Sequence, residues 1–572
     1  MDKMLDKRVF WLLLAVCALT LLPYLGFSDY HTKGEPRESV VAQAMLSDGN
    51  WILSRNNGGE MAYKPPFFHW CVAAASLVRG EVTEGASRLP SAIALILMTL
   101  GVFVFYARRR ATDLALLTAF VAFTSFELHR AGANCRVDMV LTAATVGALL
   151  SLYSWYERGM RGVPLVAIVL MAVGTLTKGP VGSIIPCLVM GLFLLLRGVN
   201  FFRAFALMVA WGVLSLLPYA VWFWAAYAQG GQEFLDLMYE ENIGRMTSTM
   251  SYESCVNPWW YNFVTLLGGY IPWNLLLVVS LFFLSYKGLK RPASDWACRL
   301  WQKVRTMSDV DLYSLVAIVA IFVFYCIPQS KRSVYLMPIY PFMAYFIAKY
   351  MLWLADFRPR ALRLYAHILG VLLVVLFVAY LLLRAGLVPD GIFHGKHAAD
   401  NLRMLRALEG IGSLWQLLLI ALSFAVGLMW WLAMRHNRSG RRTVWAIVLM
   451  TFALYLPVDM VYTPVVLNTK SVKEIAAEID RVAPQGEGAL YEYIDVGVKA
   501  KGDPVHFFEV NFYLNNRIGN FYKERPLEGF LLISQPDMEL CCEEFSQWGY
   551  RFSHLYDAPK RKMQVYKFEK DR

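Results

Sequence analysis

Residues 28–90 read SDYHTKGEPRESVVAQAMLSDGNWILSRNNGGEMAYKPPFFHWCVAAASLVRGEVTEGASRLP, a polar stretch between two long apolar segments. Charged side chains crowd its first part and return at YKPP, residues 63–66, so it is too polar to lie in lipid. Apolar residues recur at helical spacing after Pro36 and again after Pro66, and proline suits the first turn of a helix. We therefore predict two amphipathic helices in a loop long enough to carry a function.

The composition is that of a membrane protein. Of 572 residues, 57% are hydrophobic, 15% aromatic and only 17% charged, and the mean hydropathy is +0.43. Crossing a hydrocarbon core of about 30 Å takes about 20 helical residues. Runs of that kind predict thirteen spans, near residues 9–27, 89–107, 113–128, 137–156, 163–178, 180–196, 204–228, 259–284, 310–328, 334–354, 364–384, 411–434 and 443–465.

The distribution of positive charge predicts the orientation, because short loops rich in Lys and Arg stay in the cytoplasm. Lys3, Lys7 and Arg8 precede the first span, and every second loop after it is basic. We expect these loops inside, and the segments 28–88, 229–258, 385–410 and everything after residue 465 outside. The net charge of +12 then indicates contact with anionic lipid and gives no reason to expect a nucleic-acid partner.

From residue 466 onward the composition becomes that of a soluble domain. A helix is predicted in SVKEIAAEIDRVA and another in CCEEFSQWGY, with strands in GALYEYI, GFLLIS and MQVYKFEK. These elements predict a small α/β domain. It contains no nucleotide-binding glycine fingerprint and no phosphate-binding loop, which argues against sugar-nucleotide chemistry.

Further charged residues cluster at predicted span ends. Arg136 and Asp138 open the fourth span, and Lys178 precedes a Gly-Pro break. Each has a simpler interpretation, since the first two are suited to fixing helix ends and a lone lysine can extend to the membrane surface. Lys331 and Arg332 lie in a short turn predicted to be outside, against the charge rule, which suggests a bound phosphate.

The ordered set of motifs resembles the polyprenyl-phosphate-dependent membrane glycosyltransferases, in particular the lipid A 4-amino-4-deoxy-L-arabinose transferase branch of the protein mannosyltransferase-like superfamily. The motifs are GEPRE at 34–38, YKPP at 63–66, SRLPSA at 87–92, RVDMVLT at 136–142, LTKGPVG at 176–182, NIGR at 242–245, NPWWY at 257–261 and SKRSVYLMPIYP at 330–341. The resemblance implies the fold class called GT-C. In that fold we expect an α-helical polytopic membrane protein of about 13 transmembrane helices with a small C-terminal α/β soluble domain.

The expected domain division follows from the same resemblance. Residues 1–465 would form the transmembrane glycosyltransferase domain, with juxtamembrane helices in 28–88 and 229–258. Residues 466–572 would form the α/β domain. Both loops and this domain are expected to face the periplasm.

The resemblance also implies site residues. The candidates for binding the donor phosphate and substrate are Arg37, Tyr63, Lys64, Lys178, Arg245 and Lys331. Members of the family usually carry an Asp-Glu pair where this chain has Gly34 and Glu35, so the expected acid is missing. Glu35 and Asp138 remain as candidates for the general base that a hydroxyl acceptor needs, whereas a phosphate acceptor needs none.

A divalent metal is a weaker expectation. Histidine is common in the family at the position of Asn242, so Glu241 and Asn242 are weak candidate ligands, and no other cofactor is expected.

Three functions remain open at this point, in order of preference. The first is transfer of a sugar from an undecaprenyl-phosphate donor to lipid A or another surface glycoconjugate, at the periplasmic face of a bacterial inner membrane. The second is protein O-glycosylation by the same architecture. The third, transport or flipping of lipid-linked sugars, fits less well because the sequence has no internal repeat.

The predicted orientation can be tested with topology reporters. A reporter fused after Arg572 should be active only outside the cytoplasm, and one inserted in the basic segment 287–305 only inside, because positive charge keeps that loop in the cytoplasm. Fusion activities of alkaline phosphatase and green fluorescent protein measure this directly. A cytoplasmic carboxy terminus would mean that the number of spans is even.

Overall fold

The computed structural model describes residues 6–56, 58–244, 256–285, 299, 302–436, 439–493, 506–559 and 562–571. Its contacts divide the chain into two compact units. The helical unit comprises Met1–Phe27, Leu89–Val221 and Cys255–Thr469, and the polar unit comprises Ser28–Arg88, Trp222–Ser254 and Lys470–Arg572. The polar unit thus joins the predicted C-terminal domain to the first polar loop, residues 28–88.

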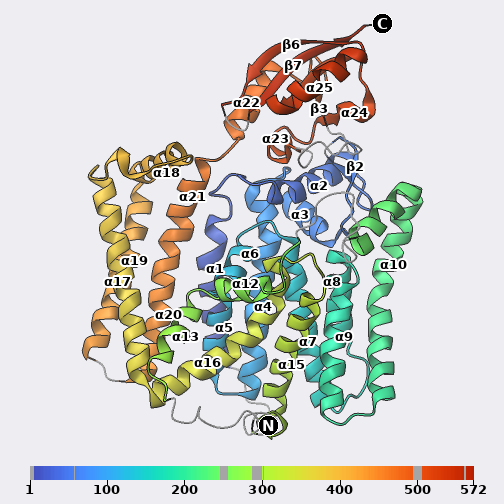
Figure 1. Ribbon diagram of the computed structural model, residues 1–572. Coiled ribbons are helices and arrows are strands. Elements are labelled where there is room, and N and C mark those ends of the chain that lie inside the picture. The colour runs from blue at the N-terminus through green and yellow to red at the C-terminus, as the bar shows by residue number, and fades with distance from the viewer. Residues whose placement is uncertain are drawn as a thin grey trace. The chain divides into compact units, whose positions relative to one another are not determined.

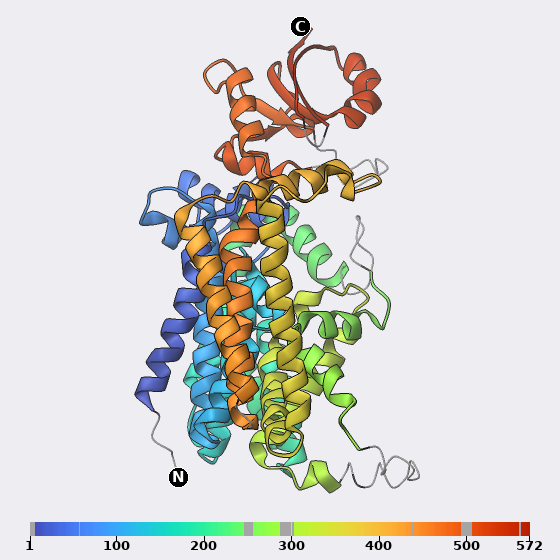
Figure 2. The same ribbon diagram turned by 90° about the vertical axis from the view of Figure 1, so that its left-hand side faces the viewer.

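The helical unit is built from long apolar helices. Helices α7, α8 and α9 pack on one another (Figure 1), and so do α17, α19 and α20, which face the viewer in Figure 2. The helices are α1 Lys7–Leu21, α4 Glu84–Arg109, α5 Thr112–Phe123, α6 Phe126–Gly132, α7 Val137–Glu157, α8 Leu165–Lys178, α9 Val181–Leu196, α10 Phe201–Tyr239, α12 Tyr261–Gly269, α13 Trp273–Leu281, α15 Asp309–Cys326, α16 Tyr340–Phe357, α17 Pro359–Arg384, α18 Ala398–Glu409, α19 Leu414–His436, α20 Gly440–Pro457 and α21 Thr463–Asn468. Short helices η1 Leu22–Tyr24, η3 Ser333–Ile339, η4 Asp390–Ile392 and η5 Val458–Tyr462 connect them. The residues of α10 from Trp222 onward, and η2 Glu240–Gly244 after it, belong to the polar unit.

The helices confirm a multi-span membrane protein. The number of spans depends on whether two bent helix pairs are each counted as one span. Among the described residues, 8 helices are long and apolar enough to cross a membrane, or up to 10 if each bent pair is one span. The bent pairs are α5 with α6, at 68°, and α12 with α13, at 101°. All thirteen predicted spans contain helix. Helices α8 and α9 have only 14 and 16 residues, however, and α16 is not apolar enough to count among the spanning helices.

Local sequence explains where several helices end. The break between α8 and α9 falls at Gly179 and Pro180, as the Gly-Pro dipeptide predicted, and Gly179 has a positive φ of 81° that other residues rarely adopt. Across this break the backbones of Gly174 and Gly182 approach closely, which only residues without a side chain permit.

The first polar loop forms the two predicted helices, α2 Gly34–Asp48 and α3 Phe67–Leu77. Pro36 lies in the first turn of α2, and Gly49, with φ 67°, ends that helix. A short hairpin of β1 Arg55–Asn56 and β2 Glu60–Met61 lies between them.

The C-terminal part of the polar unit is a five-stranded sheet in the order β4-β3-β5-β7-β6. Strands β3 Leu490–Glu492, β4 Ile518–Asn520 and β5 Glu528–Ser534 are parallel, and β7 Met563–Lys570 and β6 Tyr550–Asp557 are added antiparallel. The helices are α22 Lys473–Val482, α23 Phe508–Tyr513, α24 Phe521–Glu524 and α25 Gln535–Gln547. The predicted strands and first helix are confirmed, but the predicted last helix ends before Tyr550, which begins β6.

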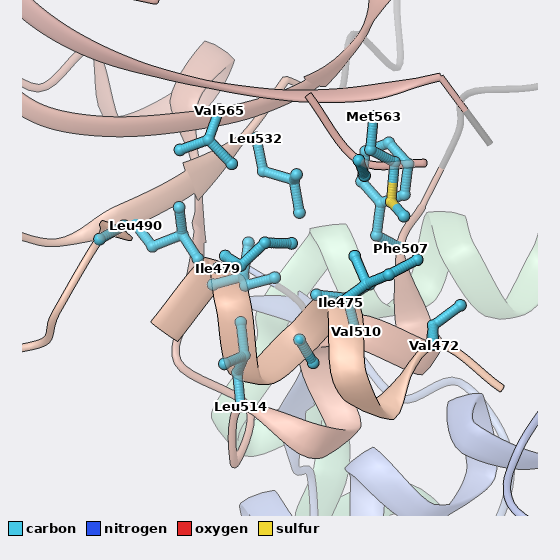
Figure 3. Packing of buried hydrophobic residues seen from close by; sticks show 14 of the residues in the cluster. Val472, Ile475, Ile479, Leu490, Phe507, Val510, Leu514, Leu532, Met563 and Val565 are labelled. Carbon is cyan, nitrogen blue, oxygen red and sulfur yellow. The ribbon is translucent and has the colours of Figure 1, made fainter. Parts of the chain in front are cut away.

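Both faces of this sheet are covered. On one face, Leu532 and Val565 pack on Ile475 and Ile479 of α22 and on residues of α23 (Figure 3). Alternate residues of β5, Leu531 and Ile533, belong to a second core that includes Phe545 of α25. This is why GFLLIS is a continuous apolar run: both sides of a central strand are buried.

Helix α23 also packs on the first polar loop. The ring of Tyr30 lies 4.7 Å from that of Phe512, centroid to centroid, and its backbone N–H donates to the Tyr513 hydroxyl at 3.0 Å. Gln43 of α2 donates to the Phe512 carbonyl at 3.0 Å. These contacts explain why the loop and the C-terminal sheet form one compact unit.

The close approach of α8 and α9 predicts a stability effect. In Gly182→Ala the new methyl group would overlap the backbone of Gly174 and Thr175, so the variant should lose about 1–3 kcal/mol of stability. Gly101→Ala, in α4 with open space around its added methyl group, is the matched control. Thermal unfolding in detergent measures both, and equal midpoints would contradict the packing described for Gly182.

Candidate functional site

Three side chains of the first polar loop, those of Arg37, Lys64 and His69, contact the carboxylate of Glu38. We call these four residues the Glu38 cluster. One carboxylate oxygen of Glu38 accepts from the Lys64 ammonium and, at 3.0 Å, from the Arg37 guanidinium. The other lies 3.0 Å from His69 Nε2, which must be the donor because a carboxylate only accepts. The cluster therefore holds two cations and one anion.

Both helices of the loop are needed to assemble this cluster. Arg37 and Glu38 lie in the first turns of α2, and Lys64 lies in YKPP just before α3. His69 lies on the buried face of α3 with Phe68 and Val72, at 1% exposure. Pro65 and Pro66 restrict the backbone conformation between Lys64 and α3. This restriction fixes the position of the Lys64 side chain relative to that of His69.

Electrostatics keep the cluster charged. Burial alone would raise the pKa of the Glu38 carboxyl, but the Lys64 ammonium and the Arg37 guanidinium hold this pKa well below its ordinary value. Burial opposes the charge on Arg37, yet the neighbouring Tyr63 and Glu38 raise the pKa of its guanidinium. The Lys64 ammonium also lies 5.8 Å from the centre of the Tyr63 ring. Arg37, Tyr63 and Lys64, three predicted binding residues, are therefore close together.

The predicted base Glu35 occupies a different environment. Both its carboxylate oxygens accept from Arg88, at 2.9 and 3.2 Å, and both residues are 2% exposed. Arg88 also donates to the Ser28 carbonyl at 2.7 Å. A carboxylate shared with a buried guanidinium is a weak proton acceptor, so this geometry favours a structural role for Glu35, and its assignment as base stays a prediction.

The helical unit contains a second charge pair at a predicted position. Asp138, in the first turn of α7, accepts from Lys178, the last residue of α8, and the ammonium lies 4.4 Å from the centre of the Tyr335 ring. The side chains are 14% and 23% exposed. Two motifs 40 residues apart are thus joined by one ion pair.

The remaining predicted binding residues are less informative. Lys331 is 5% exposed, and its ammonium donates to the carbonyls of Asn257 at 3.3 Å and Gln329 at 3.5 Å. This arrangement supports a role in fixing the chain, and its contact with a phosphate stays a prediction. Arg245 lies outside the described residues.

Both candidate metal ligands, Glu241 and Asn242, lie in η2, and their assignment stays a prediction. The side chain of Asn242 is used as a donor to the Met238 carbonyl at 2.8 Å. Among the described residues, no three His, Cys, Asp or Glu side chains are placed to hold one ion.

Sequence reasoning did not assign roles to Glu38, His69 or Arg88. Glu38 and Arg88 lie inside the motifs GEPRE and SRLPSA, so the motifs already contained them. The signal for His69 was weaker: a histidine on the apolar face of a predicted helix, five residues after Lys64.

The arrangement of the helices and of the C-terminal sheet is that of the GT-C fold, as a comparison with a solved structure shows. The structure superimposes on crystalline ArnT from Cupriavidus metallidurans bound to undecaprenyl phosphate with a TM-score of 0.70, over 98% of each chain at 19% sequence identity. At this identity the likeness shows the fold. The predicted fold class is thereby confirmed.

Sequence comparisons point in the same direction. Residues 63–224 match the family described as dolichyl-phosphate-mannose-protein mannosyltransferase. An uncharacterized protein of Aquifex aeolicus is 28% identical over 347 residues, covering 59% of this chain and 63% of its own length. The undecaprenyl phosphate-alpha-4-amino-4-deoxy-L-arabinose arabinosyl transferase 1 of Pseudomonas fluorescens is 27% identical over 342 residues, covering 57% and 56%. The matches thus span somewhat more than half the length of these relatives, and the resemblance predicted from the motifs is confirmed.

The Glu35–Arg88 pair predicts a stability effect. Glu35→Gln would leave a buried guanidinium without its counter-ion and should cost about 3–5 kcal/mol, whereas Glu35→Leu combined with Arg88→Met should recover much of the loss. Thermal unfolding in detergent measures this. A Glu35→Gln protein of normal stability that has lost only its catalytic activity would instead favour Glu35 as the base.

Proposed function

We propose that this protein is an integral membrane glycosyltransferase. It would move a sugar from an undecaprenyl-phosphate donor to lipid A or another surface glycoconjugate at the periplasmic face of a bacterial inner membrane. The observation that carries the proposal is the Glu38 cluster, where Arg37 and Lys64, from two motifs of the resemblance, both donate to one carboxylate oxygen. The GT-C fold and the undecaprenyl-phosphate relatives support it.

The chemistry needs such cations. Transfer breaks the bond between the anomeric carbon and a phosphate oxygen, and the electron pair stays on the phosphate, which becomes more negative. A fixed ammonium and guanidinium in a partly desolvated site stabilise this charge, and arginine adds two parallel hydrogen bonds. Lys64 and Arg37 are therefore assigned to the donor phosphate, and Lys178 is a further candidate.

The ion pairs formed by the two candidate bases, Glu35 and Asp138, help to identify the chemical group that accepts the sugar. Glu35 is bound to Arg88 and Asp138 to Lys178, so each candidate base already accepts a hydrogen bond from a cation. A phosphate acceptor is already anionic and needs no base. These pairs therefore favour a phosphate group, as on lipid A, over a hydroxyl.

Protein O-glycosylation is the second candidate. The match of residues 63–224 to the protein mannosyltransferase family favours it. Mass spectrometry of lipid A and of periplasmic glycoproteins, with and without the gene, separates the two: loss of a glycan from lipid A alone supports the first function, and loss from proteins alone supports the second. An unchanged pattern in both pools would contradict glycosyl transfer to either.

The assignment of Lys178 predicts a rate effect. Without this cation the leaving phosphate should lose about 2–4 kcal/mol of transition-state stabilisation, so Lys178→Ala should be roughly 30- to 1,000-fold slower. Lys349→Ala is the matched control, since Lys349 forms a comparable pair with Asp311 at 3.0 Å and has no assigned role. Transfer from a radiolabelled undecaprenyl-phosphate sugar at matched protein amounts measures both. Wild-type turnover by Lys178→Ala would leave Lys178 as a purely structural residue.

A further inference from the structure

In the Glu38 cluster an anion binds the two cations that we assign to the donor phosphate. In the described structure Lys64 and Arg37 both donate to the same oxygen of Glu38. The Glu38 side chain is 5% exposed, while those of Lys64 and Arg37 are 16% and 37% exposed. The cations thus reach the surface from a carboxylate that is buried behind them.

We propose that Glu38 is a displaceable counter-anion, which binds Lys64 and Arg37 as this structure shows, yields them to the donor phosphate and returns to them to expel the product. This inference rests on the proposed function, and it concerns the step that follows transfer. It assigns to Glu38 a role in product release.

Charge balance makes such a device useful. The donor is a phosphodiester with one negative charge, whereas the product, a polyprenyl monophosphate, carries up to two because the second pKa of a phosphate monoester is about 6. The same two cations therefore hold the product more tightly than the substrate. A carboxylate within reach of both competes with the product and weakens its retention.

His69 makes the exchange feasible. Its Nε2 holds the second carboxylate oxygen of Glu38, on the side away from Lys64. When phosphate takes the two cations, Glu38 keeps this hydrogen bond, so the displaced carboxylate is not left without a partner in a buried place. The His69 Nδ1 atom is itself buried with no hydrogen-bond partner in the described part of the chain, so the ring can adjust without breaking another bond.

The exchange does not change covalent bonds at Glu38. When the donor binds, phosphate oxygens replace the Glu38 carboxylate oxygen as acceptors for Lys64 and Arg37. After transfer, the carboxylate oxygen replaces the phosphate oxygens of the product. Glu38 stays ionised throughout and is a positioning residue. Its removal should therefore affect affinity for the product and the release step more than the transfer step.

The test is the affinity of the full-length protein for undecaprenyl phosphate in detergent. Glu38→Gln keeps the shape but removes the competing charge, so the dissociation constant should fall about 10-fold or more, the value of one charge-assisted hydrogen bond. Steady-state turnover should fall more than the rate of a single turnover, because the more tightly held product slows its own release. Asp48→Asn is the matched control, because Asp48 ends the same helix α2 and is exposed.

A second variant guards against misfolding. Glu38→Asp keeps the charge but is one methylene shorter, so it should reach the cations less well and bind undecaprenyl phosphate with an intermediate affinity. Unchanged or weaker binding by Glu38→Gln and Glu38→Asp would overturn the inference and leave the proposed function intact, provided that the wild type binds and transfers. A wild type that does not bind undecaprenyl phosphate would overturn both.

Discussion

The shared carboxylate of Glu38 is the interaction on which the first polar loop depends. Placing an ammonium or a guanidinium in a partly desolvated place costs several kcal/mol unless an anion accompanies it. Glu38 accompanies both Lys64 and Arg37, and through His69 it also joins α2 to α3. Removing this one group would leave two cations repelling each other and would free the two helices of the loop from their main polar contact.

The same principle recurs at other charged residues of the motifs. Glu35 is bound to Arg88 in the polar unit, and Asp138 to Lys178 in the helical unit. In each case the anion holds the cation in position. Preorganised cations of this kind stabilise developing negative charge without reorganising at the moment of reaction, which is what phosphate departure requires.

In the polar unit, segments far apart in sequence pack together, and the C-terminal residues contact the first polar loop. Tyr30 and Gln43 of the first polar loop contact Phe512 and Tyr513 of α23, and α23 in turn packs on the core beneath the five-stranded sheet. Conformational order in the loop thus depends on the C-terminal residues. A truncation before residue 470 would remove the surface on which α2 packs.

Much of this architecture could be predicted from the sequence. Helices, strands and the Gly-Pro break follow from periodicity and from the backbone preferences of proline and glycine, which act over a few neighbouring residues. The motifs containing Arg37, Lys64 and Lys178 also identified cationic positions, because the residue types themselves determine charge. Only the tertiary structure decided the partners: that Glu35 pairs with Arg88, that Asp138 pairs with Lys178, and that Glu38 and His69 complete a cluster. Such pairs join residues 31 to 53 positions apart, and no local pattern determines which side chains meet once the helices have packed.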